Sequence, residues 1–140
     1  MQTERDSERA EGQARLGRLG ARFRLEGDQG APVIAFVNGL TQYSALWDSY
    51  VAHFTSRGWR VARFDMIGQG DSDKPALGVS FEDHWRTLEA VLDAAQVERA
   101  HVAGISFGGT VATQFACERP ERCESLIAMS CFAEMPPQLY

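Results

Sequence analysis

The alternation of apolar and polar side chains predicts strands that take turns with helices along most of the chain. Residues 22–26 alternate between the two kinds, which is typical of a strand with one exposed face. Residues 32–37 form a continuous apolar run, as expected for a strand that is buried on both faces of a parallel sheet. Further strands are predicted at residues 59–65, 100–105 and 125–130.

Three helices are predicted between these strands from apolar residues spaced three and four positions apart. The first precedes Gly58, and the second begins at Ser80, where Asp83 completes a capping box. The third covers residues 107–118 and ends near Pro120. The apolar stripe of the second helix comprises Phe81, Trp85, Leu88, Leu92 and Ala95.

The order of these elements indicates an α/β fold, in which crossover helices connect a mostly parallel sheet. A chain of 140 residues forms one domain at most, and we assign residues 20–140 to it. Residues 1–19 carry mixed charges, so we expect a polar tail there. The ligand site of a parallel sheet lies beyond the carboxyl ends of its strands. Here residues 38–42, 65–75 and 106–109 form the loops at those ends.

The sequence Gly-Ile-Ser-Phe-Gly at residues 104–108 lies between a predicted strand and a predicted helix. In that context the G-x-S-x-G pattern indicates a nucleophile elbow, a sharp turn that raises the serine hydroxyl above the end of the sheet. Glycine is required because strand and helix backbones come very close there, leaving no room for a Cβ atom. Ser106 is therefore the candidate nucleophile; the competing interpretation is an ordinary serine in a strand-to-helix turn.

Two other loops carry motifs in the same order. Asn38-Gly39-Leu40 follows the first buried strand, and residues 65–72 read Asp-Met-Ile-Gly-Gln-Gly-Asp-Ser. Together with the elbow, these segments resemble the His-Gly-x loop and the D-x-x-G-x-G-x-S segment of the α/β-hydrolase fold superfamily. The resemblance covers about residues 20–135 and is greatest to the single-domain esterases, lactonases and C–C hydrolases.

The resemblance implies a serine hydrolase that cleaves esters, lactones, thioesters or related acyl bonds through an acyl-enzyme. Ser106 would be the nucleophile, and the backbone N–H groups of Leu40 and Phe107 would form the oxyanion hole. These donors matter because the tetrahedral intermediate concentrates negative charge on one oxygen. Asn38 stands where the family usually has histidine, but the donor is a backbone group and is kept.

The triad acid and base are harder to place. Triad residues follow the order serine, acid, histidine on this fold, so Asp65 comes too early and is expected to stabilise its own loop, as are Ser72 and Asp73. Glu134 is the one carboxylate that could occupy an acid position used by some relatives; otherwise it is a polar loop residue.

None of the three histidines is predicted to be the general base. His101 begins the strand that ends at the elbow, roughly 16 Å from Ser106 at about 3.3 Å per residue. His53 and His84 lie on predicted helices. We therefore expect this chain to be the amino-terminal portion of an α/β-hydrolase that lacks the triad acid and histidine, with essentially no turnover by itself.

The sequence is also compatible with two other functions. The absence of a recognisable base favours a non-catalytic ligand-binding or interaction protein on the same scaffold. A cofactor-free lyase or peroxidase of the same superfamily would use the same elbow. The sequence does not specify the substrate, because the residues that shape the pocket of relatives follow Ser130. Tyr43 and Trp47 are candidates to border the pocket, although a core role is favoured for both.

The resemblance implies a small-molecule acyl substrate as the partner, and composition argues against partners of other kinds. The net charge is −5, and Lys74 is the single lysine, which argues against a nucleic-acid partner. The first 18 residues lack the apolar core of a signal peptide, and no apolar run approaches the roughly 20 residues that span a bilayer. We expect a cytoplasmic protein with no membrane partner, and leave its oligomeric state open.

Cysteine spacing gives no indication of a metal site or a cofactor. The three cysteines are odd in number and lack the C-x-x-C spacing of zinc sites, so we expect ordinary thiols, no metal and no cofactor. They are Cys117, Cys123 and Cys131.

Overall fold

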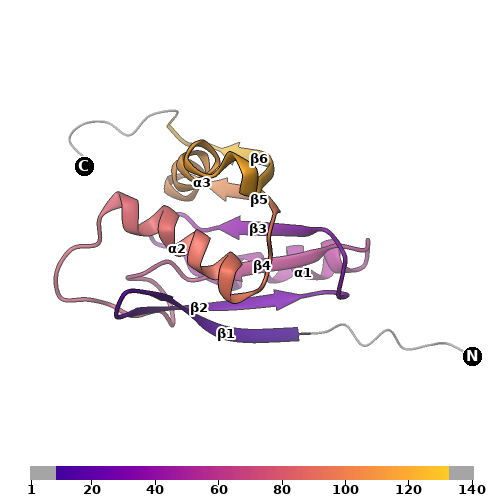
Figure 1. The fold of residues 1–140 in the computed structure, drawn as a ribbon, viewed down its shortest axis with the longest axis horizontal. Coiled ribbons are helices and arrows are strands. Elements are labelled where there is room, and N and C mark those ends of the chain that lie inside the picture. The colour runs from indigo at the N-terminus through magenta and orange to yellow at the C-terminus, as the bar shows by residue number, and fades with distance from the viewer. Residues whose placement is uncertain (1–8, 133–140) are drawn as a thin grey trace, which may run out of the picture.

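The computed structural model describes residues 9–132, which form one six-stranded sheet with helices on both faces (Figure 1). The strands are β1 (Arg9–Leu16), β2 (Leu19–Glu26), β3 (Val33–Val37), β4 (Arg60–Phe64), β5 (Ala100–Ile105) and β6 (Cys123–Met129). The helices are α1 (Asp48–Thr55), α2 (Phe81–Ala94) and α3 (Phe107–Glu118), with short 3-10 turns η1 (Ser44–Trp47) and η2 (Pro120–Arg122). In the part of the chain described, no helix is long and apolar enough to cross a membrane.

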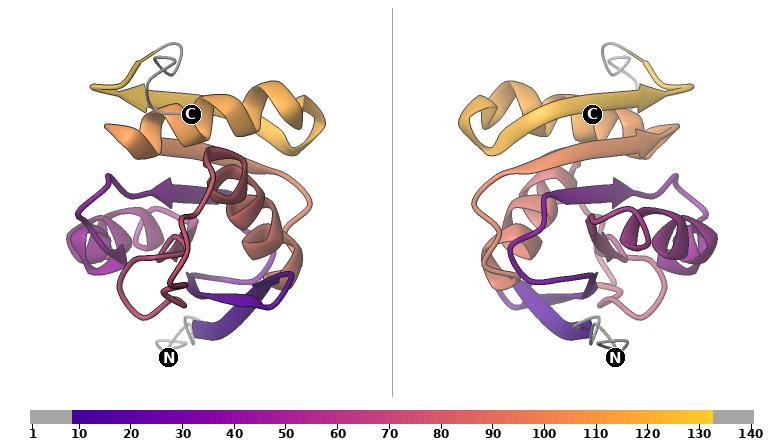
Figure 2. Two further views of the ribbon diagram at one scale, coloured as in Figure 1. Left: turned by 90° about the vertical axis from the view of Figure 1, so that its left-hand side faces the viewer. Right: turned by 90° about the vertical axis from the view of Figure 1, so that its right-hand side faces the viewer.

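The sheet has the order β1-β2-β4-β3-β5-β6, and β4, β3, β5 and β6 run parallel to one another. This confirms the predicted parallel neighbours and the α/β fold class. Helices α2 and α3 cover one face and α1 the other (Figure 2). Side chains that alternate along each central strand therefore enter two separate apolar clusters. Phe64 and Val102 lie in the cluster beneath α2 and α3, whereas Phe36 and Ala103 lie in the cluster beneath α1.

The amino-terminal prediction was wrong in part, because residues 9–16 form strand β1 rather than a polar tail. β1 pairs antiparallel with β2 through a tight turn in which Gly17 adopts a positive φ of 59°. Ala14 is buried, whereas Glu11 and Arg15 are exposed. The inward positions of β1 hold mostly small residues such as Gly12 and Ala14. The alternation of apolar and polar side chains is therefore present but weak. Residues 1–8 lie outside the described residues.

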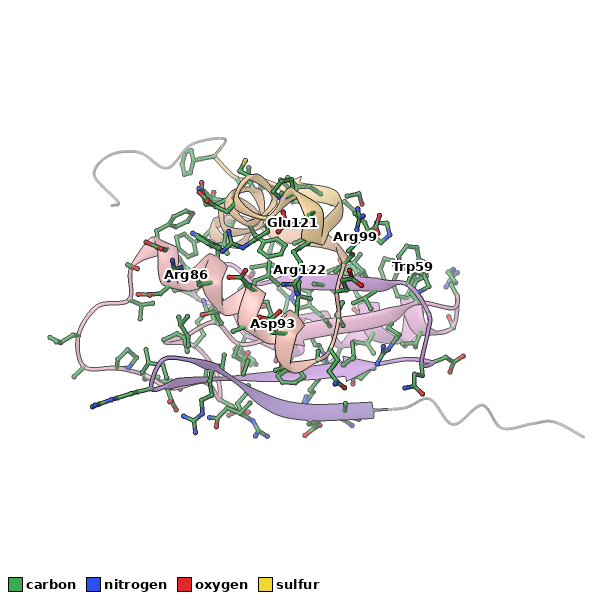
Figure 3. The ribbon with its side chains drawn as sticks, in the orientation of Figure 1. Trp59, Arg86, Asp93, Arg99, Glu121 and Arg122 are labelled. Atoms are coloured by element: carbon green, nitrogen blue, oxygen red, sulfur yellow. The ribbon has the colours of Figure 1, made fainter. Side chains whose placement is uncertain are left out.

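The second helix has the predicted amino-terminal cap. Ser80 Oγ accepts a hydrogen bond from the Asp83 N–H at 3.1 Å, and Asp83 Oδ2 accepts one from the Ser80 N–H at 2.9 Å. At the other end of this helix, the Arg122 side chain joins η2 to the carboxyl end of α2. Arg122 donates to Asp93 Oδ1 at 2.9 Å and to the Val97 carbonyl at 3.0 Å (Figure 3). The start of α2 is thus capped within the helix itself, and its end is held against η2.

Candidate active site

The loops that follow β3, β4 and β5 meet at one edge of the sheet, because these strands are parallel. Two close approaches place the 38–42 loop beside the elbow at residues 104–108. A methyl group on Gly108 would lie 2.2 Å from the Asn38 carbonyl oxygen, and one on Gly39 would lie 3.6 Å from the Ile105 carbonyl oxygen. The predicted segments are therefore in contact.

The backbone of Ser106 is strained, as the nucleophile elbow predicts. Its φ is 55° and its ψ is −126°, a conformation that non-glycine residues rarely adopt. The Ser106 N–H donates to the Met129 carbonyl of β6 at 2.8 Å, and the Ser106 carbonyl accepts the Gly109 N–H at 2.9 Å. The side chain does not cap α3 and is exposed. The hydroxyl is thus presented to solvent at the end of β5.

The glycines of the elbow are required by the packing of backbone against backbone. A methyl group on Gly104 would lie 2.2 Å from the Gly108 carbonyl oxygen, and one on Gly108 would lie 2.4 Å from the Val37 carbonyl oxygen. Both distances are far below van der Waals contact, and backbone atoms cannot move aside cheaply. The small residues of G-x-S-x-G are therefore dictated by how α3 lies against β5 and β3.

The Asn38 side chain ties the 38–42 loop to its surroundings. It is fully buried, its Nδ2 donates to the Phe64 carbonyl at 2.9 Å, and its Oδ1 accepts from Trp47 Nε1 at 2.7 Å. Trp47 is buried, so its favoured role in the core is confirmed, whereas Tyr43 is 59% exposed and the core role favoured for it is wrong. Asparagine therefore has a structural role at this position, one that joins the loop to β4 and η1.

Side-chain amides also hold the backbone of residues 39 and 40. The Gly39 N–H donates to Gln42 Oε1 at 2.7 Å. Gln69 Nε2, from the 65–75 loop, donates to the Gly39 carbonyl at 2.9 Å and to the Leu40 carbonyl at 2.8 Å. The Leu40 side chain is exposed. The convergence of the Leu40 and Phe107 N–H groups on one point stays a prediction.

Asp65 stabilises its loop, as expected from its position before Ser106. Its carboxylate accepts hydrogen bonds from the Ser44 N–H at 2.6 Å and the Asp71 N–H at 3.0 Å. Ser72 and Asp73 were expected to stabilise their own loop, but their side chains also bind the backbone of strand β2. Ser72 Oγ accepts from the Arg22 N–H at 2.9 Å, and Asp73 Oδ2 accepts from the Gly20 N–H at 2.8 Å. Together these bonds fix the 65–75 loop to strand β2.

The histidines differ in their relation to the elbow. His53 is exposed on α1, and His101 Nδ1 lies 2.8 Å from Ser125 Oγ. His84 packs edge-on against the ring of Phe107, the residue after Ser106, with ring centroids 5.1 Å apart. Burial lowers the pKa of the His84 imidazole, against the opposing effect of the Asp83 charge. His84 Nδ1 is buried and has no hydrogen-bond partner within the described residues.

The contact between His84 and Phe107 was not anticipated, because the local sequence around either residue gives no sign of it. It arises where α2 packs on α3, the helix that follows it after β5. Glu134, the candidate acid, lies outside the described residues. Within residues 9–132 no group of three or more His, Cys, Asp or Glu side chains could hold a metal ion.

Residues 32–139 match the model of the alpha/beta hydrolase fold family, so the chain belongs to that family. It is similar to a haloalkane dehalogenase from Mesorhizobium japonicum, at 31% identity over 75% of this chain and 34% of the relative. It is also similar to a 2-hydroxy-6-oxononadienedioate/2-hydroxy-6-oxononatrienedioate hydrolase from Paraburkholderia xenovorans, at 32% identity over 72% of this chain and 36% of the relative.

Among solved structures, a hydrolase from Pseudomonas aeruginosa superposes with a TM-score of 0.84 at 29% identity, over 91% of this chain and 48% of that one. The thioesterase domain of the curacin biosynthetic pathway gives a TM-score of 0.80 at 20% identity, over 94% and 48%, and shows the fold alone. The chain thus spans about a third of the length of these curated relatives, and about half of each solved chain.

Proposed function

We propose that this chain carries the nucleophile of a serine hydrolase that cleaves an ester, lactone, thioester or related acyl bond. The observation that carries the proposal is Ser106 itself, an exposed hydroxyl on a strained turn at the carboxyl end of β5. The relatives named as hydrolases support a hydrolytic reaction on this scaffold. We also propose a cytoplasmic location, because the three cysteines are free thiols and a reducing compartment keeps thiols reduced.

In the proposed reaction, Ser106 Oγ attacks the acyl carbon and gives its proton to a general base. The negative charge moves to the carbonyl oxygen, which the Leu40 and Phe107 N–H groups bind. Collapse of the tetrahedral intermediate expels the alcohol or thiol, which takes the proton, and leaves an acyl-serine. A water molecule then attacks the acyl-serine with the same base, which releases the acid and restores Ser106.

The general base is proposed to come from polypeptide that corresponds to the other half of the solved relatives. A serine hydroxyl is a weak nucleophile at neutral pH without a base. No described side chain forms a hydrogen bond to Ser106 Oγ in the way a triad histidine would. That same observation favours a second candidate, a protein that binds a small apolar ligand over Ser106 without turning it over.

Hydrolysis of a p-nitrophenyl ester by this chain and by a longer form tests the proposal. We expect essentially no turnover from the 140-residue chain. The longer form should be active, and Ser106→Ala should abolish the activity whereas Ser49→Ala, on the exposed surface of α1, should leave it intact. A fluorophosphonate probe should label Ser106 in the longer form.

Three results would contradict parts of this proposal. Turnover that survives Ser106→Ala would exclude the serine nucleophile. Ligand binding by the longer form without labelling of Ser106 would favour the non-catalytic candidate. Robust turnover of the 140-residue chain, lost on His84→Ala, would show that the base lies within this chain.

A further inference from the structure

Gln69 connects two of the three loops at the candidate site. It lies in the 65–75 loop, and its single amide nitrogen donates to the carbonyls of both Gly39 and Leu40, at 2.9 and 2.8 Å. Only the nitrogen end of the amide can occupy this place, because two carbonyl oxygens face it. The contact is thus chemically unambiguous, and it fixes two successive peptide groups of the 38–42 loop.

The contact with Gln69 also fixes the direction of the Leu40 N–H, because this N–H and the Gly39 carbonyl belong to the same peptide group. A trans peptide is planar, and its C=O and N–H bonds point in opposite directions. Because Gln69 holds the Gly39 carbonyl, the Leu40 N–H must point away from Gln69. The Gly39 N–H is already bound to Gln42 Oε1 at 2.7 Å. Of these two amides, the Leu40 N–H is therefore the one left for a ligand.

The position of Gln69 is itself well defined. Its backbone N–H donates to the Met66 carbonyl at 2.9 Å, and its carbonyl accepts the Ser72 N–H at 3.0 Å. The Asp65 carboxylate and Ser72 Oγ fasten the same loop to η1 and β2. A rigid support of this kind is what an oxyanion hole requires, since its donors act by being in place before charge develops.

We infer that Gln69 is a positioning residue that aims the Leu40 N–H at the oxyanion formed on the substrate carbonyl. This inference rests on the proposed function. Gln69 does not touch the reacting atoms; it acts through the 39–40 peptide plane. Its Oε1 is buried without a partner in the described part of the chain, so the two donated bonds account for the side chain's position.

Gln69→Met removes the donors at nearly constant shape, and Gln69→Glu places a carboxylate against two carbonyl oxygens. In the longer, active form we expect kcat to fall about tenfold to a hundredfold with KM little changed, because the lost interaction belongs to the transition state. Gln69→Glu should have the larger effect. Gln114→Met is the matched control, because its amide on α3 is exposed and donates to Glu118 Oε1 at 2.8 Å.

Amide NMR of the 140-residue protein gives a readout that does not depend on activity. The Leu40 amide signal should shift in Gln69→Met and stay unchanged in Gln114→Met. An unchanged kcat, an unchanged Leu40 signal, or a rise in KM alone would overturn the inference. If Ser106→Ala leaves turnover intact, the proposed function fails instead, and the Leu40 signal still decides whether Gln69 sets the peptide plane.

Discussion

The elbow and the 38–42 loop touch at the edge of the sheet, yet different forces hold each in place. The elbow is shaped by backbone contacts, since a methyl group on Gly104 would lie 2.2 Å from the Gly108 carbonyl oxygen. The 38–42 loop is shaped by side chains from elsewhere, chiefly Trp47, which donates to Asn38 Oδ1 at 2.7 Å, and Gln69.

This difference decides how each region responds to change. Excluded volume in the elbow permits almost no substitution at its glycines, because any Cβ meets main-chain atoms that cannot withdraw. The hydrogen bonds of the 38–42 loop can be removed one at a time, each at the modest cost of one unpaired group. Mutations should therefore have large effects in the elbow and graded effects in the loop.

The largest effect is expected where the two regions meet. Gly108→Ala places a Cβ atom 2.2 Å from the Asn38 carbonyl oxygen, so α3 and β3 must move apart. We expect a loss of about 3 kcal/mol or more in the free energy of unfolding, the upper end of overpacking effects. Urea denaturation measures it. Gly78→Ala is the matched control, because a methyl group there meets nothing within 4 Å; an equal loss in both variants would refute the argument.

The same difference explains what the sequence could predict. The elbow was predictable because G-x-S-x-G, the preceding apolar strand and the following helix are contiguous, and local sterics then set the turn. The parallel direction of the central strands was predictable from the alternation of strands and helices, whereas their order in the sheet comes from the structure. The Gln69 bonds were not predictable, because they join residues whose proximity depends on how two loops fold over the sheet.

Strand β1 shows a second limit of the sequence. Its inward side chains are mostly small, so the sequence shows little alternation of apolar and polar residues. The strand pairs with β2 and packs against α2, and neither contact can be recognised from the residues of β1 alone. The contact of His84 with Phe107 is of the same kind. It depends on how α2 packs against α3. The spacing of apolar residues in one helix does not show which other helix it will contact.

A graded effect is expected for Asp65→Asn, which weakens the support of the loops. The Asp65 carboxylate accepts two backbone N–H groups, at 2.6 and 3.0 Å, and an asparagine has only one oxygen to offer. One half-buried N–H then faces an amide NH₂, and we expect a loss of about 2 kcal/mol in unfolding free energy. Asp71→Asn, at an exposed position in the same loop, is the control. Equal stability of the two variants would contradict a role for Asp65 in holding the loop.

A smaller change is expected for Trp47→Phe, which keeps the aromatic contact with Phe36 but removes the indole N–H. The Asn38 Oδ1 atom then lies buried without its donor, which costs about 1 kcal/mol. NMR shifts should change at residues 38–42 and much less at residues 104–108. Trp59→Phe, which alters a half-buried indole at the other end of the sheet, should leave both regions unchanged. NMR shifts of equal size in the elbow would contradict the claim that the two regions are held in place by different interactions.

The smallest effect is expected for His84, the polar neighbour of the elbow. Burial lowers the pKa of its imidazole below the ordinary value of 6.5, so the unfolded chain binds more protons than the folded one between these two pKa values. Stability therefore rises with pH across that window and is lost as pH falls from about 6.5 toward the lower, folded pKa. His84→Leu removes this pH-dependent contribution, because a leucine side chain binds no proton in either state. Urea denaturation from about pH 7.5 to about pH 5 should show a weaker loss of stability in the variant than in the wild type. His53→Leu, at an exposed position on α1, controls for the substitution. An unchanged pH dependence in His84→Leu would show that the imidazole beside Phe107 titrates alike in the folded and unfolded chains.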